Sequence, residues 1–261
     1  MTPDRSETLT GAAPGIGHLL RHALPNAITV MALGFGLTAL VFAVDGNVSA
    51  AVACVLVSGL LDACDGRVAR ATGSASRFGA ELDSLSDAIC FGAVPAFMLY
   101  LWGLRDFGMA GWLVCLTVAA ACALRLARFN VTVDRPGKPS WTAHYFTGVP
   151  APAGAFLALL PIYAESGGIL DRSSAGLLAM VSVPVTAVLM VSTWPSFSAK
   201  TVSRKALRLL FVPSLLALLA MAVGLFLDPW RTLTLAAAVY LLLLPVSRWR
   251  YGRHLRRAGL A

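Results

Sequence analysis

The sequence predicts an all-α protein, a polytopic membrane bundle of about eight transmembrane helices. Composition is the first reason: of 261 residues, 57% are hydrophobic and 13% are charged, whereas soluble proteins carry about 25% charged residues. The mean hydropathy of +0.74 agrees with this. The second reason is that apolar stretches long enough to cross a bilayer recur along the whole chain. These observations exclude an ordinary soluble domain.

Each expected span is placed by its apolar run. The runs cover residues 25–44, 48–68, 84–103, 109–129, 148–165, 174–193, 207–226 and 230–247. The fifth run contains Pro150, Pro152 and Pro161. Membrane helices tolerate proline where neighbouring groups satisfy the freed backbone, so we still expect a span there.

Polar segments flank these runs at both ends of the chain. We expect a tail with a short interfacial amphipathic helix over residues 1–24, a membrane domain over 25–247 and a basic tail over 248–261. The basic tail places arginines among aromatic and apolar residues. This pattern is typical of an anchor on an anionic membrane surface.

The distribution of cations predicts the orientation. With the N-terminus inside, the cytoplasmic segments hold all of the 21 lysines and arginines except Arg105, Arg172 and Arg231. By the positive-inside rule, we expect both termini to face the cytoplasm of a multi-pass protein in the cell (inner) membrane. The net charge of +8 then faces anionic lipid headgroups. No zinc finger, basic-region helix or base-stacking pattern supports nucleic acid as a partner.

One stretch, residues 62–87, interrupts the apolar pattern with five of the 13 acidic residues. They are Asp62, Asp65, Glu81, Asp83 and Asp87. Ionisable residues in membrane helices are costly and usually mark a functional site. The first two aspartates are three residues apart and the last two are four apart, so each pair is expected on one face of its own helix.

The residues between the two pairs favour a turn. Gly73, Ser74, Ser76 and Gly79 break the helical pattern over 71–80, so the two helices are expected to turn back beside each other and the aspartates to converge. Carboxylates at such short distances repel one another unless cations lie between them. Mg2+ or Mn2+ suits an all-oxygen set, and three or four shared carboxylates are typical of a two-metal site for phosphoryl chemistry.

Small and basic residues accompany the acids. Gly66 and Gly79 remove side chains where a ligand or the facing helix must approach. Arg70 and Arg77 are placed to neutralise phosphate oxygens.

The whole pattern resembles the signature of the CDP-alcohol phosphatidyltransferases. The residues at its eight fixed positions are Asp62, Asp65, Gly66, Ala69, Arg70, Gly79, Asp83 and Asp87. At roughly 5–8% per residue type, a chance match in this chain is on the order of one in ten million. The resemblance implies transfer of a phosphatidyl group from CDP-diacylglycerol to a small alcohol with release of CMP, by a protein that is often a homodimer.

The resemblance also implies roles for individual residues. Asp62, Asp65, Asp83 and Asp87 would hold two divalent ions that bridge the diphosphate, and Asp87 would be the catalytic base that deprotonates the acceptor hydroxyl. The residues expected to bind CDP-diacylglycerol are Asn26, Thr29, Asp62, Gly66, Ala69, Arg70, Ser76 and Gly79. For Asn26 and Thr29, helix capping or a hydrogen bond between helices is the alternative.

A second segment bears on the acceptor. Arg125 and Arg128 lie three apart, followed by Asn130, and by themselves they fit a positive-inside anchor. Together with FTGVPAPA over residues 146–153 they resemble the phosphatidylserine synthase branch of the family. That resemblance implies L-serine as the acceptor, its carboxylate near these three residues.

Other functions stay open. Glycerol 3-phosphate, inositol phosphate or choline would use the same chemistry, and a phosphorylated acceptor could also use the cations at 125–138. A cation channel or transporter explains intramembrane acids but not the spacing of Gly66, Arg70 and Gly79. A non-catalytic membrane scaffold would be expected to have lost a carboxylate, and all four are present.

Overall fold

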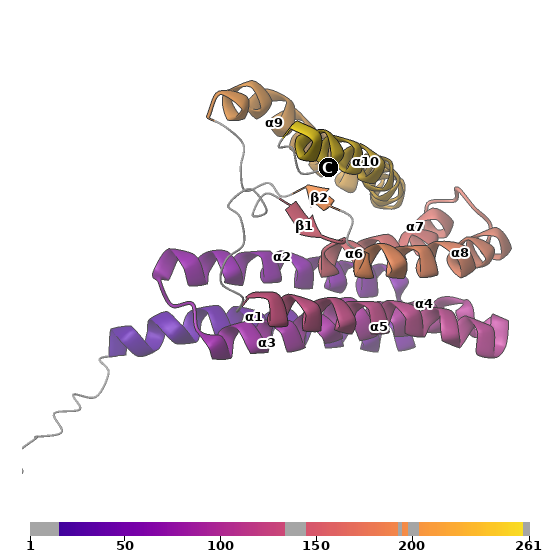
Figure 1. The fold of residues 1–261 in the computed structure, drawn as a ribbon. Helices are drawn as coiled ribbons and strands as arrows, with labels where there is room; N and C mark the ends of the chain where they lie inside the picture. The colour runs from indigo at the N-terminus through magenta and orange to yellow at the C-terminus, as the bar shows by residue number, and fades with distance from the viewer. Residues whose placement is uncertain (1–15, 134–144, 193–194, 198–203, 258–261) are drawn as a thin grey trace, which may run out of the picture.

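The computed structural model describes residues 16–133, 145–192, 195–197 and 204–257. This part of the chain is helical apart from one pair of three-residue strands (Figure 1). Five stretches are long and apolar enough to cross a membrane. They are Ala23–Val44, Val48–Thr72, Arg77–Trp102, Leu104–Val131 and Arg172–Val191. The expected helical membrane bundle is therefore confirmed, with five of its eight expected spans found.

The other three expected spans are also helical. Residues 148–165 are divided between α6 (Ala151–Ala158) and α7 (Leu160–Ser166). Pro161 lies in the first turn of α7, where its missing N–H cannot continue the preceding helix. The last two lie within α9 (Arg204–Leu227) and α10 (Pro229–Arg257), whose described parts include the apolar stretches Leu215–Leu227 and Pro229–Leu244.

The N-terminal half begins with a helical hairpin. α1 (Ile16–Val44) packs along α2 (Val48–Thr72). The side chain of Asn47 accepts a hydrogen bond from Ala50 N at 3.1 Å and begins α2. The interfacial helix expected before residue 25 is part of α1, which continues through Pro25. The rest of the expected N-terminal tail, residues 1–15, lies outside the described residues.

The third stretch changes its helical type on the way. It consists of α3 (Arg77–Asp87), the π-helix η1 (Ala88–Ala93) and α4 (Val94–Trp102). Pro95 is the second residue of α4, and a proline ring clashes with the carbonyl four residues earlier in a regular α-helix. The wider π turn accommodates that clash. It begins at the residue after Asp87.

The remaining elements complete the bundle and cover one side of it. The 3-10 helix η2 (Leu104–Phe107) leads into α5 (Gly108–Val133), and α5 packs against α8 (Arg172–Val191). Strand β1 (Tyr145–Thr147) pairs antiparallel with β2 (Pro195–Phe197), a departure from a purely helical fold. α9 (Arg204–Leu227) and α10 (Pro229–Arg257) follow, and the residues expected as a basic tail are helical up to Arg257.

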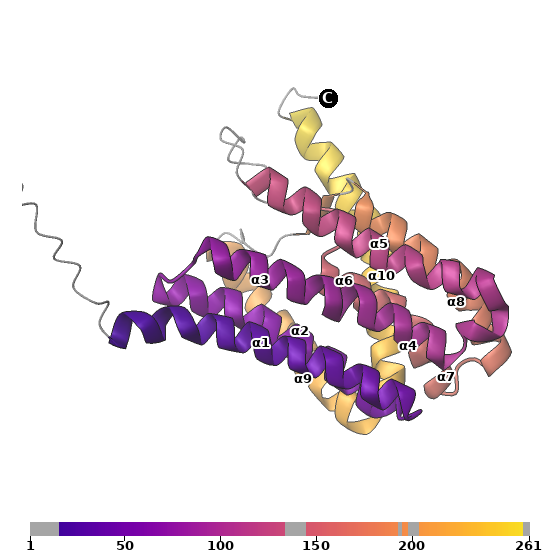
Figure 2. The ribbon, with the colours of Figure 1, turned by 90° about the horizontal axis from the view of Figure 1, so that it is seen from below.

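The core lies where α4, α5, α6, α7 and α8 meet. Its fully buried members include Leu99, Val118, Ala155, Tyr163 and Val183. Small residues allow close helix approach, as is usual in membrane bundles. Figure 2 shows α1, α2 and α3 running side by side, so that the turn between α2 and α3 lies at one end of the bundle.

Candidate active site

Three of the four predicted aspartates meet between α2 and α3. One carboxylate oxygen from each of Asp62, Asp83 and Asp87 lies within 4.8 Å of the other two. All three residues are partly buried. The spacing argument is confirmed here, since Asp83 and Asp87 lie one turn apart on α3 and face Asp62 on α2.

The turn between the two helices forms as the sequence predicts. Gly73 ends α2 in the left-handed region, with φ of 64°, and its N–H is directed at the carbonyls of Ala69 and Arg70. Ser76 begins α3 by accepting a hydrogen bond from Gly79 N at 3.0 Å. Ser76 thus acts as a helix cap in this structure, and its side chain also lines the adjacent cavity.

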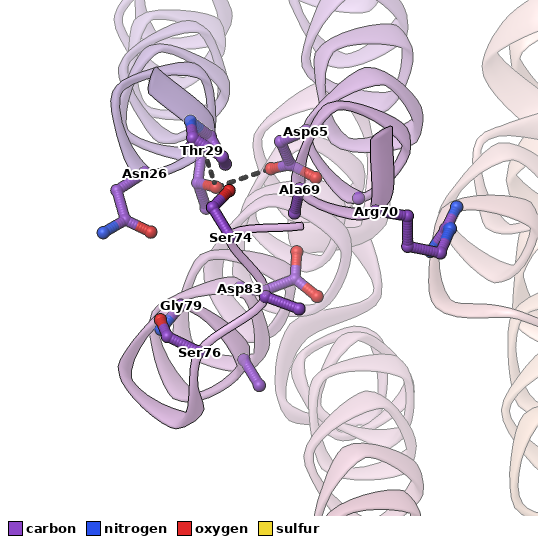
Figure 3. Close-up of a pocket in the computed structure, with 13 residues that line it drawn as sticks. Asn26, Thr29, Asp65, Ala69, Arg70, Ser74, Ser76, Gly79 and Asp83 are labelled. Carbon is purple, nitrogen blue, oxygen red and sulfur yellow. Dashed lines mark hydrogen bonds between the residues drawn. The ribbon is translucent and has the colours of Figure 1, made fainter. Parts of the chain in front are cut away.

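Asp65 lies outside this three-carboxylate cluster. Its Oδ2 accepts a hydrogen bond from Thr29 Oγ1 on α1 at 2.6 Å (Figure 3), and the residue is only 4% exposed. The same hydroxyl lies 3.1 Å from Pro25 O. A buried carboxylate needs such a donor, because an unpaired buried charge is costly. Thr29 therefore makes the interhelical hydrogen bond that the sequence left as an alternative to ligand binding.

A cavity of about 190 Å3 opens beside the carboxylates, between residues 25–29 of α1 and the α2–α3 turn. Seven of the eight residues expected to bind CDP-diacylglycerol line it. They are Asn26, Thr29, Gly66, Ala69, Arg70, Ser76 and Gly79, together with Asp65 and Asp83 (Figure 3). Asp62 does not line the cavity, and it contributes to the carboxylate cluster instead.

The two glycines of the pattern differ in what they permit. A Cβ at Gly79 would lie 3.1 Å from Asn26 Oδ1, so glycine lets α3 approach α1 closely. A Cβ at Gly66 would meet nothing closer than Arg70 Nη1 at 3.5 Å. Glycine at position 66 therefore leaves space in the cavity itself.

Sequence reasoning missed four lining residues, Pro25, Ser74, Ala75 and Ala80. Ser74 is buried, and its Oγ lies 2.6 Å from Thr72 Oγ1. The signal was its position directly after Gly73, where the chain leaves the helix and turns toward α1.

The predicted acceptor residues separate into two groups. Arg125 interacts electrostatically with Asp87, and its buried Nε lacks a hydrogen-bond partner within the described part of the chain. Asn130 Oδ1 accepts from Ser84 Oγ at 3.2 Å, which ties α5 to α3. Arg128 is directed elsewhere: its Nη1 donates to Val191 O at 2.8 Å, and its side chain is exposed. Only the first two therefore lie toward the carboxylate helix.

The second motif, residues 146–153, packs against the end of α8. Gly148 has φ of 79°, and a Cβ there would lie 2.5 Å from Met190 O and 2.8 Å from Ser192 O. Val149 N also donates to Leu189 O at 3.2 Å. The glycine is required both by its backbone angle and by the close approach.

The cluster has the chemistry of a hard-cation site. Its members offer only carboxylate oxygens, from Asp62, Asp83 and Asp87, which are the ligands that Mg2+ and Mn2+ prefer. Their mutual proximity would be unfavourable without a cation between them. The residues present therefore fit a divalent metal.

These features define a helical membrane protein with a carboxylate cluster beside a cavity. The family model for CDP-alcohol phosphatidyltransferase matches residues 22–191. The chain therefore belongs to the CDP-alcohol phosphatidyltransferase family.

Within this family, the chain is similar to several proteins whose names state an activity. A Mycobacterium tuberculosis protein named CDP-diacylglycerol--serine O-phosphatidyltransferase is 40% identical over 187 residues, which cover 67% of this chain and 65% of that protein. A Mycobacterium leprae protein of the same name is 36% identical over 232 residues, covering 87% of this chain and 76% of the relative. An archaetidylserine synthase from Methanothermobacter thermautotrophicus is 34% identical over 163 residues, 62% of this chain and 66% of that protein.

Proposed function

We propose that this protein transfers the phosphatidyl group of CDP-diacylglycerol to L-serine, giving phosphatidylserine and CMP. The observation that carries the proposal is the meeting of Asp62, Asp83 and Asp87 beside a cavity lined by the residues expected to bind the nucleotide lipid. Family membership supports phosphatidyl transfer. The names of the relatives support serine as the acceptor.

The aspartates would hold Mg2+ or Mn2+, in a two-metal site if Asp65 joins the cluster when ligand binds. Bound metal would supply positive charge to stabilise the β-phosphate and the departing CMP. In this proposal Asp87 accepts the proton of the serine hydroxyl, whose oxygen forms the new bond to the β-phosphate as the bond to CMP breaks.

The cavity residues would bind the nucleotide and the diphosphate. Arg70 lines the cavity, and its guanidinium can pair with phosphate oxygens. Asn26 and Ser76 offer polar groups for the cytidine part, and Gly66 and Ala69 leave it room. Asp62 was expected among these residues, and its place in the carboxylate cluster favours the metal role.

The serine carboxylate would bind at Arg125. Its Nε is buried without a partner among the described residues, beside Asp87, so an incoming carboxylate would satisfy a donor that is otherwise unpaired. Asn130 is joined to the carboxylate helix α3 by the hydrogen bond that its Oδ1 accepts from Ser84. Arg128 was expected to share the role, but its contact with Val191 favours a part in joining α5 to α8.

The membrane arrangement belongs to the same proposal. We propose eight spans with both termini and the active site on the cytoplasmic side of the cell membrane. Five spans by length and composition and the cation distribution support it. A site at the membrane boundary lets the lipid tails stay in the bilayer while the cytidine diphosphate stays in water. A homodimer remains a prediction from the resemblance.

The test is CMP release by the purified protein supplied with CDP-diacylglycerol and Mn2+ or Mg2+. L-serine, glycerol 3-phosphate, inositol phosphate and choline are offered separately, with a chelator control. We expect release with serine alone and none with chelator. Release with a different acceptor would overturn serine while keeping phosphatidyl transfer, and no release with any acceptor would overturn the function.

A further inference from the structure

A second cavity lies at the opposite end of the bundle from the aspartates. It has a volume of about 200 Å3 and is formed where the α1–α2 turn, the end of α4, α7 and the start of α8 meet. Figures 1 and 2 both place these element ends away from the α2–α3 turn. Its walls are apolar, with Ala51, Met98, Ile162 and Trp102 buried, and the exposed Arg172 lies at its rim.

The rim arginine is held in a fixed position. Arg172 Nη1 donates to both carboxylate oxygens of Glu165, at 3.1 and 2.9 Å. Its Cζ lies 4.5 Å from the centre of the Trp102 ring, within the range of a cation–π contact. Trp102 Nε1 donates to the same Glu165 at 2.5 Å. Long surface side chains normally keep their rotamer freedom, so three joined contacts on one guanidinium indicate preorganisation.

Part of this guanidinium remains available. Among the described residues, Nε and Nη2 of Arg172 have no hydrogen-bond partner, and its side chain is 50% exposed. A Cβ built on the neighbouring Gly103 would lie 3.1 Å from Nη2, so the glycine leaves space for this position. Nε and Nη2 form the edge that pairs with two oxygens of a phosphate or carboxylate.

We propose that this cavity binds an anionic phospholipid. Its acyl chain would lie against Ala51, Met98 and Ile162, and its phosphate would accept hydrogen bonds from the free edge of Arg172. A free inorganic anion would gain nothing from apolar walls, and a neutral apolar molecule would gain nothing from a fixed guanidinium. An amphiphile with one negative headgroup uses both. None of these residues belongs to the carboxylate cluster, so the inference is independent of the proposed function.

Because Glu165 and Arg172 carry opposite charges, substituting each of them should change the affinity for an anionic lipid in opposite directions. The Glu165 carboxylate lies on the other side of the guanidinium and repels an arriving phosphate. Glu165→Gln keeps an oxygen to accept from Trp102 Nε1 but removes that negative charge, so it should strengthen binding of an anionic lipid. Arg172→Gln removes the donors and should weaken binding. A merely structural ion pair would instead respond to both substitutions in the same direction.

The experiment titrates dioleoyl phosphatidylglycerol and, separately, dioleoyl phosphatidylcholine into the delipidated full-length protein in detergent, with native mass spectrometry counting bound lipids. We expect preference for phosphatidylglycerol in the wild type, a loss of about tenfold in Arg172→Gln, corresponding to one charge-assisted contact, and a gain in Glu165→Gln. The matched control is Arg105→Gln, an exposed arginine whose described ionic contact is Asp106 at 4.0 Å.

Two further measurements distinguish binding of the whole lipid in the cavity from binding of its phosphate alone. Ala51→Leu, which fills the cavity without changing charge, should weaken phosphatidylglycerol binding, and millimolar inorganic phosphate should not displace the lipid. The proposal is overturned if Arg172→Gln binds like Arg105→Gln, or if Glu165→Gln weakens binding. Equal affinity for phosphatidylcholine, or displacement by inorganic phosphate, would also overturn it.

Discussion

Hydrogen bonds made by single side chains decide which aspartates meet. Asp65 is drawn to Thr29 on α1, while Asp62 faces the α3 pair. A three-residue spacing on one helix places two carboxylates on one face, but it does not fix which neighbour each of them contacts. The four acids were predictable from the sequence. The separation of Asp65 from the other three depends on Thr29, a hydrogen-bond partner 36 residues away in the sequence.

The first prediction concerns the hydrogen bond from the Thr29 hydroxyl to Asp65. Thr29→Val keeps the shape but leaves the buried Asp65 carboxylate without this donor. We expect CMP release with serine to fall about tenfold or more, as hydrogen bonds to charged groups are worth about 1.5–3 kcal/mol. Thr29→Ser, which keeps the hydroxyl, should retain most activity. Equal activity of the valine and serine variants would contradict a positioning role.

Arg125 and Arg128 should behave differently, although they lie three residues apart. Arg125→Gln should raise the KM for serine about tenfold, because a charge-assisted contact is lost, with a smaller effect on the KM for CDP-diacylglycerol. Arg128→Gln should leave both KM values within about twofold and lower the apparent Tm, since Val191 O loses its donor. The reverse pattern would show that the serine site was assigned to the wrong arginine.

Among the elements, turns and helix ends place the catalytic side chains. Gly73 and Ser76 were expected in the turn between the aspartate pairs, and both end or begin a helix there. The π turn after Asp87 was not predictable, because periodicity does not distinguish a π turn from an α turn. Pro95 was visible, but its effect depends on how the neighbouring helices pack.

The close packing of the second motif against α8 can be tested by comparing alanine substitutions at Gly148 and Gly73. Both have positive φ, 79° and 64°, but a Cβ meets the backbone of α8 at Gly148 and nothing within 4 Å at Gly73. Gly73→Ala should cost about 1–2 kcal/mol from its backbone angle. Gly148→Ala should cost about 2–5 kcal/mol, because displacement of α8 is added. Thermal unfolding in detergent shows which variant loses more stability. Equal losses of stability would contradict the close approach of Gly148 to α8.

The beginning of α8 should respond to pH. Asp171 accepts hydrogen bonds from Ser174 Oγ at 2.7 Å and from the N–H groups of Ser174 and Ser173. The hydrogen bonds from Ser174 lower the pKa of Asp171 below its ordinary value. Its stabilising effect is therefore present above the unfolded pKa, about 3.9, and is lost as the pH falls through the lower folded pKa.

Asp171→Ala tests this cap directly. At neutral pH the variant should have a lower apparent Tm than the wild type, and the difference should shrink below about pH 4. Asp106→Ala, which removes an exposed acid whose described ionic contact is Arg105 at 4.0 Å, is the control and should show no such pH-dependent difference. A pH-independent difference in the Asp171 variant would contradict the carboxylate cap.

For the whole molecule, composition and apolar runs predicted a helical membrane bundle. What they did not predict is the division of residues 148–165 into α6 and α7 or the strand pair β1–β2. These features depend on packing against the end of α8, which no local pattern contains. The exposed apolar side chains over residues 215–223 of α9 fit a surrounding bilayer, where apolar surface faces lipid rather than water.

Incorporation of labelled L-serine into lipid by purified wild type and Asp87→Asn tests the central claim most directly. With CDP-diacylglycerol and Mn2+ or Mg2+, the wild type should form serine-containing lipid and equimolar CMP. Asp87→Asn should lose at least about a hundredfold in rate while still binding CDP-diacylglycerol, and Asp45→Asn, at an exposed acid in the α1–α2 turn, should match the wild type. Wild-type turnover by Asp87→Asn would contradict the assignment of catalysis to the carboxylate cluster.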